Sequence, residues 1–462
     1  MCRLSENTVD EILQEGRIFE VGGAVRDKYL RESKISKDYD YLVTGIPYDN
    51  LITILKNHGR VDLVGRSFGV IKFTQFKDGV SHIFDITLPR VEHSTGTGHK
   101  DFTVDFDYNL KVEEDLVRRD FTINAMAFAL DKQELVDPLN GRKDITNRQL
   151  RMVYDESFED DPLRMLRAIQ FAARFDFEIE PKTFQAIKEN VSLIKTVSGE
   201  RIAEELNKML VLADKPSTGF QLLRATSFLS ELLPELGECI DVEQPGGYHK
   251  YDVFEHTLRV IDACQPKLNL RLAALFHDIN KPQHKRLVEK GANFYGHEVS
   301  GAKTATKVLR KFKYSNEMIR DVRTLVKRHM FSADVTEKGL RRLVKKVGVD
   351  LIFDLLDLRR ADVIGQGMGG TTEDVDEFEI SIKEELNKKP PFSISDLAID
   401  GNDIMLMFKI KPGPLVGKIL DYLMELVLDD PGNNTLEKLK SFAEKYFQEY
   451  VENNINNRGN NL

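Results

Sequence analysis

Two glycines and two aspartates near the start of the chain have types and spacing that suit catalysis. Gly22 and Gly23 stand in VGGAVRDKYL, and Asp38 and Asp40 follow in KDYDYLVTG. Because strand side chains repeat every two residues, both aspartates would project from one face and jointly bind a hard cation such as Mg²⁺. The glycines would let backbone N–H groups approach a triphosphate, and GAVRDKYL is typical of a helix whose N-terminus favours anions. Together these residues indicate nucleotidyl transfer.

A third carboxylate supports this interpretation. GVIKFTQF and HIFDITLPR are typical of two strands joined by the turn KDG, and the second strand carries Asp85. Asp85 would complete a two-metal site, where one ion activates a hydroxyl and the other holds a triphosphate. The alternative is an ordinary polar residue on an open strand face. A second pair, Asp105 and Asp107 in VDFDYN, has no glycine step before it, and we interpret it as loop or edge decoration.

The segment LVRRDFTINAMAFAL opens an apolar run with an Arg-Arg-Asp cluster. Arg119, Asp120 and Asn124 would fix phosphate and ribose, because arginine binds phosphate through two hydrogen bonds, and a carboxylate or amide accepts from sugar hydroxyls. The alternative is that Asp120 only caps a helix.

These motifs and two later ones resemble a known family. In order, the chain contains VGGAVRD, KDYD, FDIT, RRDFTINAMA, DDPLRMLRAIQFAARF and GERIAEELNKML. This order resembles the class II tRNA nucleotidyltransferases and bacterial poly(A) polymerases. The resemblance implies a polymerase-β-like head, helical neck, body and tail domains, and untemplated addition of CTP and ATP to RNA 3′ ends. It implies Asp38, Asp40 and Asp85 as catalytic carboxylates, with Mg²⁺ on the first two, and nucleotide contacts from Gly22, Gly23, Arg26, Arg119, Asp120 and Asn124.

DDPLRMLRAIQFAARF resembles the protein template of that family. Asp161 and Arg164 are three residues apart and would share a helix face. The carboxylate would accept from an exocyclic amine and the guanidinium would donate to a ring nitrogen. This pattern fits cytosine and adenine and excludes uracil and guanine. Asp160 or Asp161 before Pro162 is also a good helix start. The family usually has Glu at the position of Asp160, and a shorter side chain there would alter how the template is braced.

Further arginines follow on the same expected helix. Arg167 and Arg174 are seven residues apart and would approach phosphates or the tRNA end, or else only solvate the outer surface. The resemblance assigns Arg167 to the nucleotide, and it gives Glu200 and Arg201 a structural role in the neck. The stretch 90–118 contains HSTGTGHKDF, where the family has a flexible element that helps the switch from CTP to ATP.

Histidines concentrate in the middle of the chain. Only ten occur in 462 residues, yet His256, His277, His297 and His329 fall within one stretch, and Asp278 follows His277. An adjacent His-Asp pair supplies mixed nitrogen and oxygen ligands for a transition metal. The order of these residues, ending at Asp362, resembles the HD phosphohydrolase superfamily.

This second resemblance implies a metal ion held by His256, His277, Asp278 and Asp362. His297 and His329 would be second-site ligands or phosphate contacts. The superfamily usually has Gly where this chain has Asn280, which bears on activity more than on fold.

Composition and patterning suggest three or four domains. Hydrophobic residues make up 41% of the chain, enough for several cores. Strand and helix patterns alternate to about residue 150, and helical periodicity follows. We predict an α+β nucleotidyltransferase head at 1–150, a helical neck at 151–235, an HD domain at 236–365 and a helical tail at 366–462, which resembles the tail that contacts the tRNA elbow.

Other features concern location and partners. Cys2, Cys239 and Cys264 form no metal or disulfide pattern, and no segment has the apolar core of a membrane span or signal peptide, so we expect a cytoplasmic location. The formal charge of −9 is unusual for an RNA-binding protein. RNA contacts would come from local patches such as RKFK at 310–313 and RRLVKK at 341–346, unless these are solvated helix faces.

The leading hypothesis is CCA addition to tRNA from CTP and ATP. The acidic charge argues against the nearest alternative, a poly(A) polymerase, because indiscriminate RNA binding relies on cationic surface. CC-only or A-only enzymes, or a protein that is chiefly an HD phosphohydrolase, stay open.

Overall fold

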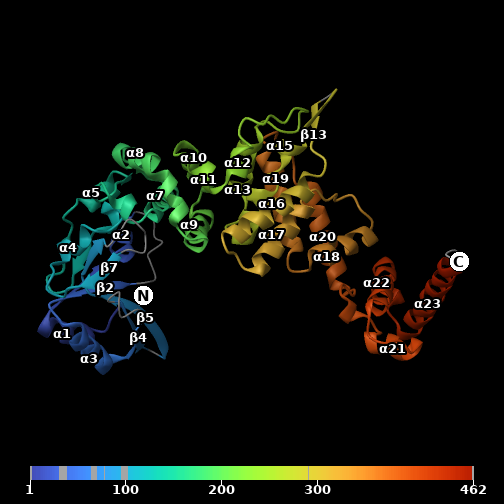
Figure 1. Ribbon diagram of the computed structural model, residues 1–462, viewed down its shortest axis with the longest axis horizontal. Helices are drawn as coiled ribbons and strands as arrows, with labels where there is room; N and C mark the ends of the chain where they lie inside the picture. Colours follow the sequence, from blue (N-terminus) through green and yellow to red (C-terminus); the bar gives the residue numbers. More distant parts are fainter. Residues whose placement is uncertain are drawn as a thin grey trace. The chain divides into compact units, whose positions relative to one another are not determined.

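The computed structural model describes residues 3–30, 39–63, 70–77, 79–94, 102–289 and 291–459 (Figure 1). The chain divides into two compact units, Met1–Glu238 with Arg310–Tyr314, and Cys239–Leu309 with Ser315–Leu462. No helix in the described ranges combines the length and apolar character that a membrane span requires.

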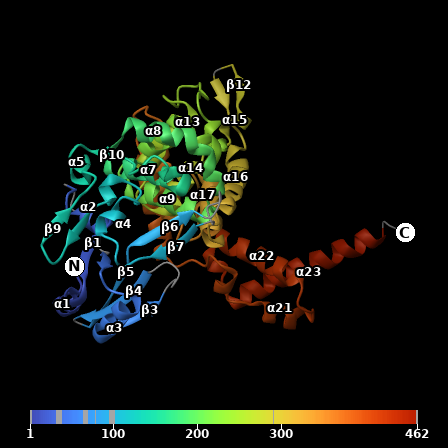
Figure 2. The same cartoon turned by 60° about the vertical axis from the view of Figure 1, so that its left-hand side comes forward.

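The first unit is built on a seven-stranded mixed sheet in the order β3-β4-β5-β2-β1-β8-β9. Its strands are β1 (Arg17–Val21), β2 (Asp40–Thr44), β3 (Arg60–Leu63), β4 (Val70–Lys77), β5 (Val80–Thr87), β8 (Ala127–Ala129) and β9 (Glu134–Val136). Strands β2 and β5 are parallel, and the other neighbours are antiparallel. Two short pairs lie outside this sheet: β6 (Arg90–Ser94) with β7 (Phe102–Phe106), drawn in Figure 2, and β10 (Gln149–Leu150) with β11 (Glu178–Ile179).

Alternating side chains bury both faces of the central strands. Ile18 and Tyr41 belong to a core that includes residues of α1 (Glu6–Glu15) and α3 (Tyr48–His58). Phe19 and Leu42, each the next residue along its strand, belong to a second core with α4 (Val112–Leu116). Because successive strand side chains point to opposite faces, helices cover both sides of the sheet and hold its strands in place.

The remaining helices of the first unit follow the strands in the chain. They are α2 (Gly23–Asp27), α5 (Gly141–Thr146), α6 (Ser157–Asp160), α7 (Leu163–Phe175), α8 (Pro181–Asn190), α9 (Gly199–Leu212), α10 (Pro216–Ala225), α11 (Phe228–Leu232) and α12 (Pro234–Gly237). Helices α7, α9 and α10 pack closely, since a Cβ at Gly219 of α10 would lie 2.1 Å from Met209 Sδ of α9 and 3.2 Å from Ala173 Cβ of α7. Any larger residue there would require the Met209 side chain to move.

The second unit is almost wholly helical. Its helices are α13 (Val253–Ala263), α14 (Leu268–Phe276), α15 (Lys281–His284), α16 (His297–Lys311), α17 (Asn316–Arg328), α18 (Glu337–Val347), α19 (Ile352–Gly365), α20 (Glu373–Asn387), α21 (Gly401–Phe408), α22 (Pro414–Asp429) and α23 (Leu436–Gly459). One hairpin, β12 (Arg286–Val288) with β13 (Gly291–Asn293), interrupts the described helices.

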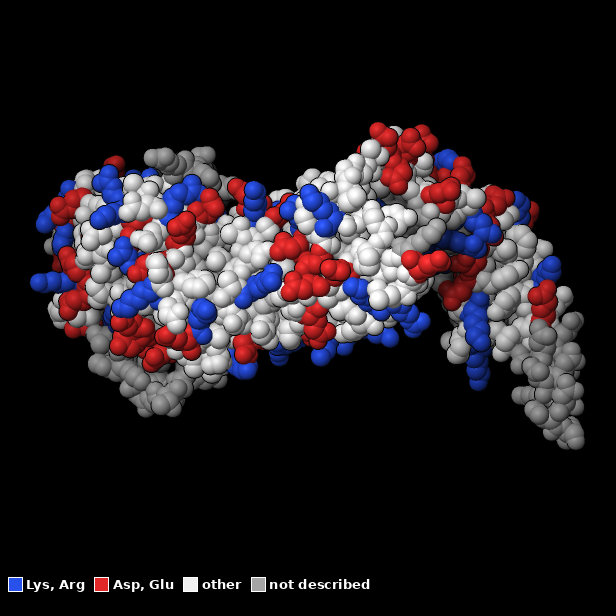
Figure 3. All heavy atoms as spheres, turned by 90° about the horizontal axis from the view of Figure 1, so that it is seen from above, with Lys and Arg blue, Asp and Glu red and all other residues white. Residues whose placement is uncertain are grey.

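The predicted α+β head and helical remainder are confirmed. Strands β4 and β5 form a hairpin at the predicted KDG turn, and only GAVRD of the predicted helix GAVRDKYL forms the short helix α2. The start of RRLVKK is structural, because Arg341 is buried against Glu385 of α20 at 2.8 Å and Arg342 pairs with Glu425 of α22 at 3.1 Å, whereas Lys346 at its end is exposed. On the face seen in Figure 3, basic and acidic side chains are interspersed.

Candidate active site

Neighbouring strands bring the predicted catalytic groups to one edge of the sheet. Asp40 pairs with Val21 of β1 on one side and with Asp85 of β5 on the other. Gly22 follows β1 directly, and a Cβ there would lie 3.5 Å from Asp40 Oδ2 and 3.4 Å from Arg119 NH1. The structure therefore brings together the glycine step, two of the three carboxylates and the arginine. Asp38 lies outside the described residues.

Gly22 makes the turn from β1 into α2. Its φ of +69° lies in the left-handed region, which glycine adopts without strain and a β-branched residue does not. The side-chain-free backbone faces Asp40, so a phosphate group can approach the carboxylate edge closely. That Gly22 and Gly23 bind a triphosphate stays a prediction.

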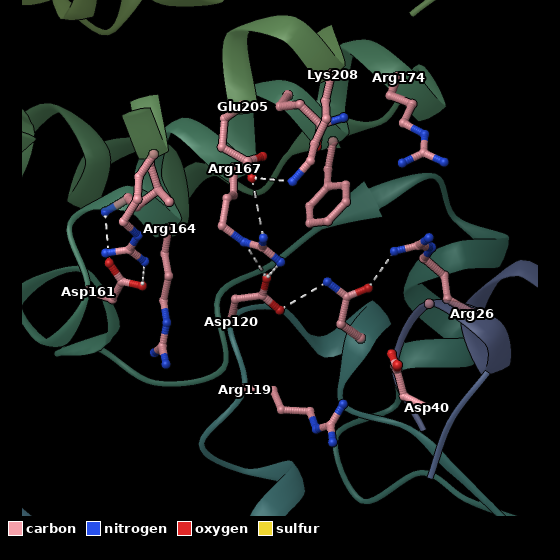
Figure 4. Close-up of a pocket in the computed structure, with 17 residues that line it drawn as sticks. Arg26, Asp40, Arg119, Asp120, Asp161, Arg164, Arg167, Arg174, Glu205 and Lys208 are labelled. Atoms are coloured by element: carbon pink, nitrogen blue, oxygen red, sulfur yellow. Dashed lines mark hydrogen bonds and ion pairs between the residues drawn. The ribbon is translucent and has the colours of Figure 1, made fainter. Parts of the chain in front are cut away.

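Asp120 is the centre of a hydrogen-bonded network shown in Figure 4. Its Oδ2 accepts from Arg167 Nε at 3.0 Å and NH2 at 2.7 Å. Its Oδ1 accepts from Asn124 Nδ2 at 3.0 Å, and Asn124 Oδ1 accepts from Arg26 NH1 at 2.7 Å. Burial alone would raise the pKa of Asp120, but the charge of Arg167 and the bond from Asn124 lower it below its ordinary value.

The capping alternative for Asp120 is not what the structure shows, because the short helix that follows spans Thr122–Asn124, its N-cap residue is Phe121 and no side chain caps it. Asp120 Oδ1 does accept from the backbone N–H of Phe121 at 2.8 Å. The same carboxylate is also held ionised between Arg167 and Asn124 beside the cavity, which a cap alone does not require.

The template pair, Asp161 and Arg164, lies at the start of α7. Asp161 Oδ1 accepts from the backbone N–H of Leu163 at 3.2 Å, and Oδ2 accepts from Arg201 NH2 at 2.9 Å. The helix begins at Leu163, one residue later than the sequence predicts. Asp161 thus supports the helix start and faces the cavity at once, and Arg201 braces it.

Arg164 is held by three elements. Its NH1 donates to the Tyr154 hydroxyl at 2.8 Å and to Ser157 Oγ at 3.0 Å, and its NH2 donates to the Arg118 carbonyl at 3.1 Å. The Tyr154 hydroxyl donates in turn to Asp160 Oδ2 at 2.6 Å. The aspartate that departs from the family pattern therefore braces the template pair through a tyrosine.

One cavity of about 510 Å³ collects these groups, a volume typical of small-molecule sites. All nine residues predicted to bind nucleotide line it, together with Asp40. Asp85 lines an adjoining cavity with Asp40. Arg167 and Arg174 both line the first cavity while staying half-exposed, and Arg174 also lines a second cavity. Sequence reasoning missed Gln170, Glu205 and Lys208, although their spacing from Arg167 and Arg201 puts them on the same helix faces.

The second unit gathers the predicted HD residues into one buried cluster. His256 Nε2 lies 3.3 Å from His277 Nε2, 3.3 Å from Asp278 Oδ2 and 3.2 Å from Asp362 Oδ1. Lys281 Nζ lies 2.7 Å from Asp278 Oδ2. These facing nitrogen and oxygen atoms are a donor set that suits a transition-metal ion.

Two more histidines approach the other oxygen of Asp278. His297 Nε2 lies 3.1 Å from Asp278 Oδ1 and 3.2 Å from His329 Nε2. Burial lowers the pKa of His329 to about 3, so its ring is neutral. Burial would also lower the pKa of His256, but its hydrogen bonds to Asp278 and Asp362 raise it to about 9, so a metal ion bound there would have to displace its proton.

Backbone carbonyls orient three of these rings. Nδ1 of His277, His297 and His329 each lies 2.7 Å from the carbonyl of the residue three positions earlier. An Nδ1–H that donates to a carbonyl leaves Nε2 with a free lone pair toward the cluster, which is the usual arrangement of metal-binding histidines. Asn280 is buried beside the cluster, and its Nδ2 donates to Gln283 Oε1 at 3.0 Å.

Three family models match parts of the chain. They describe the poly A polymerase head domain at residues 18–151, the RNA- and SrmB-binding site of polymerase A at 176–240, and tRNA nucleotidyltransferase domain 2 at 297–443.

Related proteins and structures agree with these matches. An A-adding tRNA nucleotidyltransferase from Deinococcus radiodurans is 33% identical over 359 residues, which cover 73% of this chain and 80% of that protein. A multifunctional CCA protein from Cupriavidus metallidurans is 34% identical over 352 residues, covering 72% and 79%. The crystal structure of the Bacillus stearothermophilus CCA-adding enzyme in complex with CTP has the same fold, with a TM-score of 0.69 and 22% identity over 96% of this chain and 97% of that one.

Proposed function

Because this chain belongs to the family of tRNA nucleotidyltransferases and bacterial poly(A) polymerases, we propose that it adds CTP and ATP to the 3′ end of tRNA and so builds or repairs CCA. The observation that carries the proposal is the single cavity that joins Asp40, the Asp120 network and the template pair. In the reaction, the terminal hydroxyl of the RNA attacks the α-phosphate of the nucleotide, and pyrophosphate leaves.

Nucleotidyltransferases of this fold use divalent metal ions, and we propose Mg²⁺ for this protein. The donor set fits, because Asp40 and Asp85 are register neighbours on parallel strands and their carboxylates line one cavity. Asp38 would supply the third carboxylate. When bound, the ions would lower the pKa of the attacking hydroxyl and neutralise charge on the triphosphate.

The remaining residues would position the nucleotide. Arg119 beside Gly22 would bind phosphate, and Asp120 with Asn124 would bind the ribose. Asp161 and Arg164 would read the Watson–Crick edge, accepting from an exocyclic amine and donating to a ring nitrogen. The contacts from Arg201 and Tyr154 support this role, because they fix the orientation of both side chains before a nucleotide binds.

We also propose the four-part division into head, neck, HD domain and tail, with the tail contacting tRNA by shape. The cytoplasm is the proposed location. Cys239 and Cys264 are buried free thiols, which agrees with a reducing compartment.

The test is incorporation of labelled CTP and ATP, separately and together with Mg²⁺, into tRNA that lacks its last three, two or one nucleotides. Ordered addition of C, C and A that then stops is the expected result. Unlimited addition of A to any RNA would identify a poly(A) polymerase instead. No incorporation at any end would overturn the proposal.

A-only addition is the second candidate, since the Deinococcus radiodurans relative is named an A-adding enzyme. The template pair accepts both cytosine and adenine, so it does not separate the two. Incorporation of C into tRNA that lacks its last three nucleotides decides between them.

A further activity is favoured by the four-histidine cluster of the second unit. We propose that it holds a metal ion for phosphate hydrolysis, through His256, His277, Asp278 and Asp362. Changing Asp38 and Asp40 to Ala should abolish nucleotide incorporation and spare phosphate release. If that double variant loses both activities, the second activity does not belong to the cluster.

A further inference from the structure

Gln170 is a buried amide whose hydrogen bonds are unmade among the described residues. Its side chain on α7 is 1% exposed, and neither Oε1 nor Nε2 has a hydrogen-bond partner. Burying an unpaired amide destabilises a fold, because the water that bonded it is lost and nothing replaces it. Gln170 nevertheless lines the nucleotide cavity. Both amide atoms lie just beneath the cavity surface, so a ligand in the cavity would complete their hydrogen bonds once the amide turns toward it.

The groups around Gln170 are also suited to a ligand. On α7 it shares a face with Arg167 and Arg174, which are three residues before it and four after. On α9, Glu205 is 2% exposed, and its Oε1 accepts from Lys208 at 2.7 Å, whereas Oε2 has no hydrogen-bond partner in the described structure. Figure 4 shows Arg174 and Lys208 reaching toward the cavity from these two helices.

The incoming nucleotide already has partners for each of its parts. The template pair serves its base, the Asp120 network its ribose, and the edge at Gly22 and Asp40 its phosphates. The second substrate, the RNA 3′ end, has to enter the same cavity to bring its hydroxyl to Asp40. The unassigned groups on α7 and α9 are therefore available for its last nucleotide.

We propose that Gln170 binds the base of the last nucleotide of the acceptor RNA, while Arg174 and Lys208 bind its phosphate and Glu205 accepts from its ribose 2′-hydroxyl. This assignment rests on the proposed nucleotidyl transfer. Two cations suit a phosphodiester, and a carboxylate oxygen suits the hydroxyl that distinguishes RNA from DNA.

A side-chain amide suits the 3′ end of the RNA, because the last base of the RNA changes as nucleotides are added. Gln170 offers one acceptor and one donor side by side, and a turn of the amide reverses their order. It can therefore pair with cytosine, which shows an amine beside an acceptor nitrogen, and with uracil, which shows the reverse. The charged template pair has a fixed order and is selective, whereas Gln170 is adaptable. An enzyme that extends a variable base first and cytosines afterwards needs both kinds of contact.

The test is steady-state addition of A to tRNA that ends in CC, with tRNA and ATP varied separately. Gln170→Leu keeps the side-chain volume and removes both hydrogen-bonding groups. We expect the KM for tRNA to rise about tenfold, the effect of one or two lost hydrogen bonds, with the KM for ATP unchanged. The melting temperature should stay the same or rise, because an apolar side chain replaces an unpaired buried amide.

Gln185→Leu is the matched control. Gln185 is an exposed residue of α8 whose amide donates to Glu189 at 2.8 Å, and it should alter neither KM. A rise in the KM for ATP alone, or no change in either KM for Gln170→Leu, would overturn the assignment.

A binding measurement separates this inference from the proposed reaction. Fluorescence anisotropy with a labelled RNA hairpin ending in CC reports RNA affinity even if the parent protein incorporates no nucleotide. Weaker binding by Gln170→Leu than by the parent and Gln185→Leu supports the assignment, and equal binding by all three overturns it.

Discussion

The Tyr154 hydroxyl lies 2.8 Å from Arg164 NH1 and accepts its N–H. The same hydroxyl donates to Asp160 at 2.6 Å, so a tyrosine links this carboxylate to the guanidinium proposed to read the base. Burial raises the pKa of Tyr154 to about 12, which keeps the hydroxyl protonated at neutral pH. The family usually has Glu at position 160, and the Asp160 side chain is shorter by one methylene. The Tyr154 hydroxyl lies between Asp160 and Arg164 and connects the two.

Tyr154→Phe should therefore weaken nucleotide selection. Arg164 loses one of the bonds that orient it, so we expect kcat/KM for CTP and ATP to fall about tenfold and misincorporation of UTP and GTP to increase. Competition assays with all four nucleotides measure this directly. Tyr314→Phe is the control, because Tyr314 is another half-buried tyrosine of the first unit and its hydroxyl donates to Asn207 at 2.5 Å. Equal selectivity in both variants would contradict a positioning role for Tyr154.

The Asp120–Arg167 ion pair should make stability depend on pH. In the folded protein the pKa of Asp120 is lowered, since Arg167 and Asn124 outweigh the effect of burial. Its contribution is therefore present above the unfolded pKa of about 3.9 and is lost as the pH falls through the lower folded pKa. We expect Asp120→Asn to lower the free energy of unfolding by about 2 kcal/mol at pH 7, and by progressively less below about pH 4.

Urea unfolding between pH 3 and pH 7 measures this difference. Asp131→Asn is the comparison, because Asp131 forms a 2.9 Å ion pair with Arg17 that is more exposed to solvent. That variant should lose less stability at pH 7. A difference between parent and Asp120→Asn that grows toward low pH would contradict the assigned direction.

The carboxylate edge should be essential for incorporation. Asp40→Asn or Asp85→Asn removes a carboxylate that we propose as a metal ligand at the reacting phosphate, so kcat should fall by about 10² to 10³ with little change in melting temperature. Asp107→Asn is the control from the other aspartate pair. Asp107 Oδ1 accepts from the backbone N–H of Asn109 at 2.9 Å within a turn, so its loss should leave kcat unchanged. Full activity in Asp85→Asn would remove Asp85 from the proposed site.

Local patterns explain why the carboxylate edge was predictable. The hairpin carrying Asp85 follows from alternating apolar residues around a glycine turn, and Gly22 with Asp40 stands at the end and start of neighbouring strands. Asp40 and Asp85 lie opposite each other because β2 and β5 pair in this register. That register is set by tertiary structure, and the spacing of the two residues in the sequence does not specify it.

Burial explains why other groups were missed. Gln170 stands in an apolar helical run, and its near-complete burial becomes visible only in the folded protein. For Arg341 the sequence suggested an exposed basic residue, whereas the folded protein buries it. Its partner Glu385 is 44 residues later in the chain, so the sequence alone does not show the ion pair. Such partners are distant in sequence, and periodicity reports only which face of a helix is apolar.

The histidine cluster should bind metal independently of nucleotide incorporation. His277→Ala removes an Nε2 atom that lies 3.2 Å from Asp278 Oδ2 and 3.3 Å from His256 Nε2, so metal content after dialysis and phosphate release should both drop to background. Addition of CTP and ATP to tRNA should stay at the parent level, because the nucleotide cavity is lined entirely by residues of the first unit. His82→Ala is the control, since His82 lies on β5, outside the cluster. Parent-level metal content in His277→Ala would show that the cluster is not the metal site.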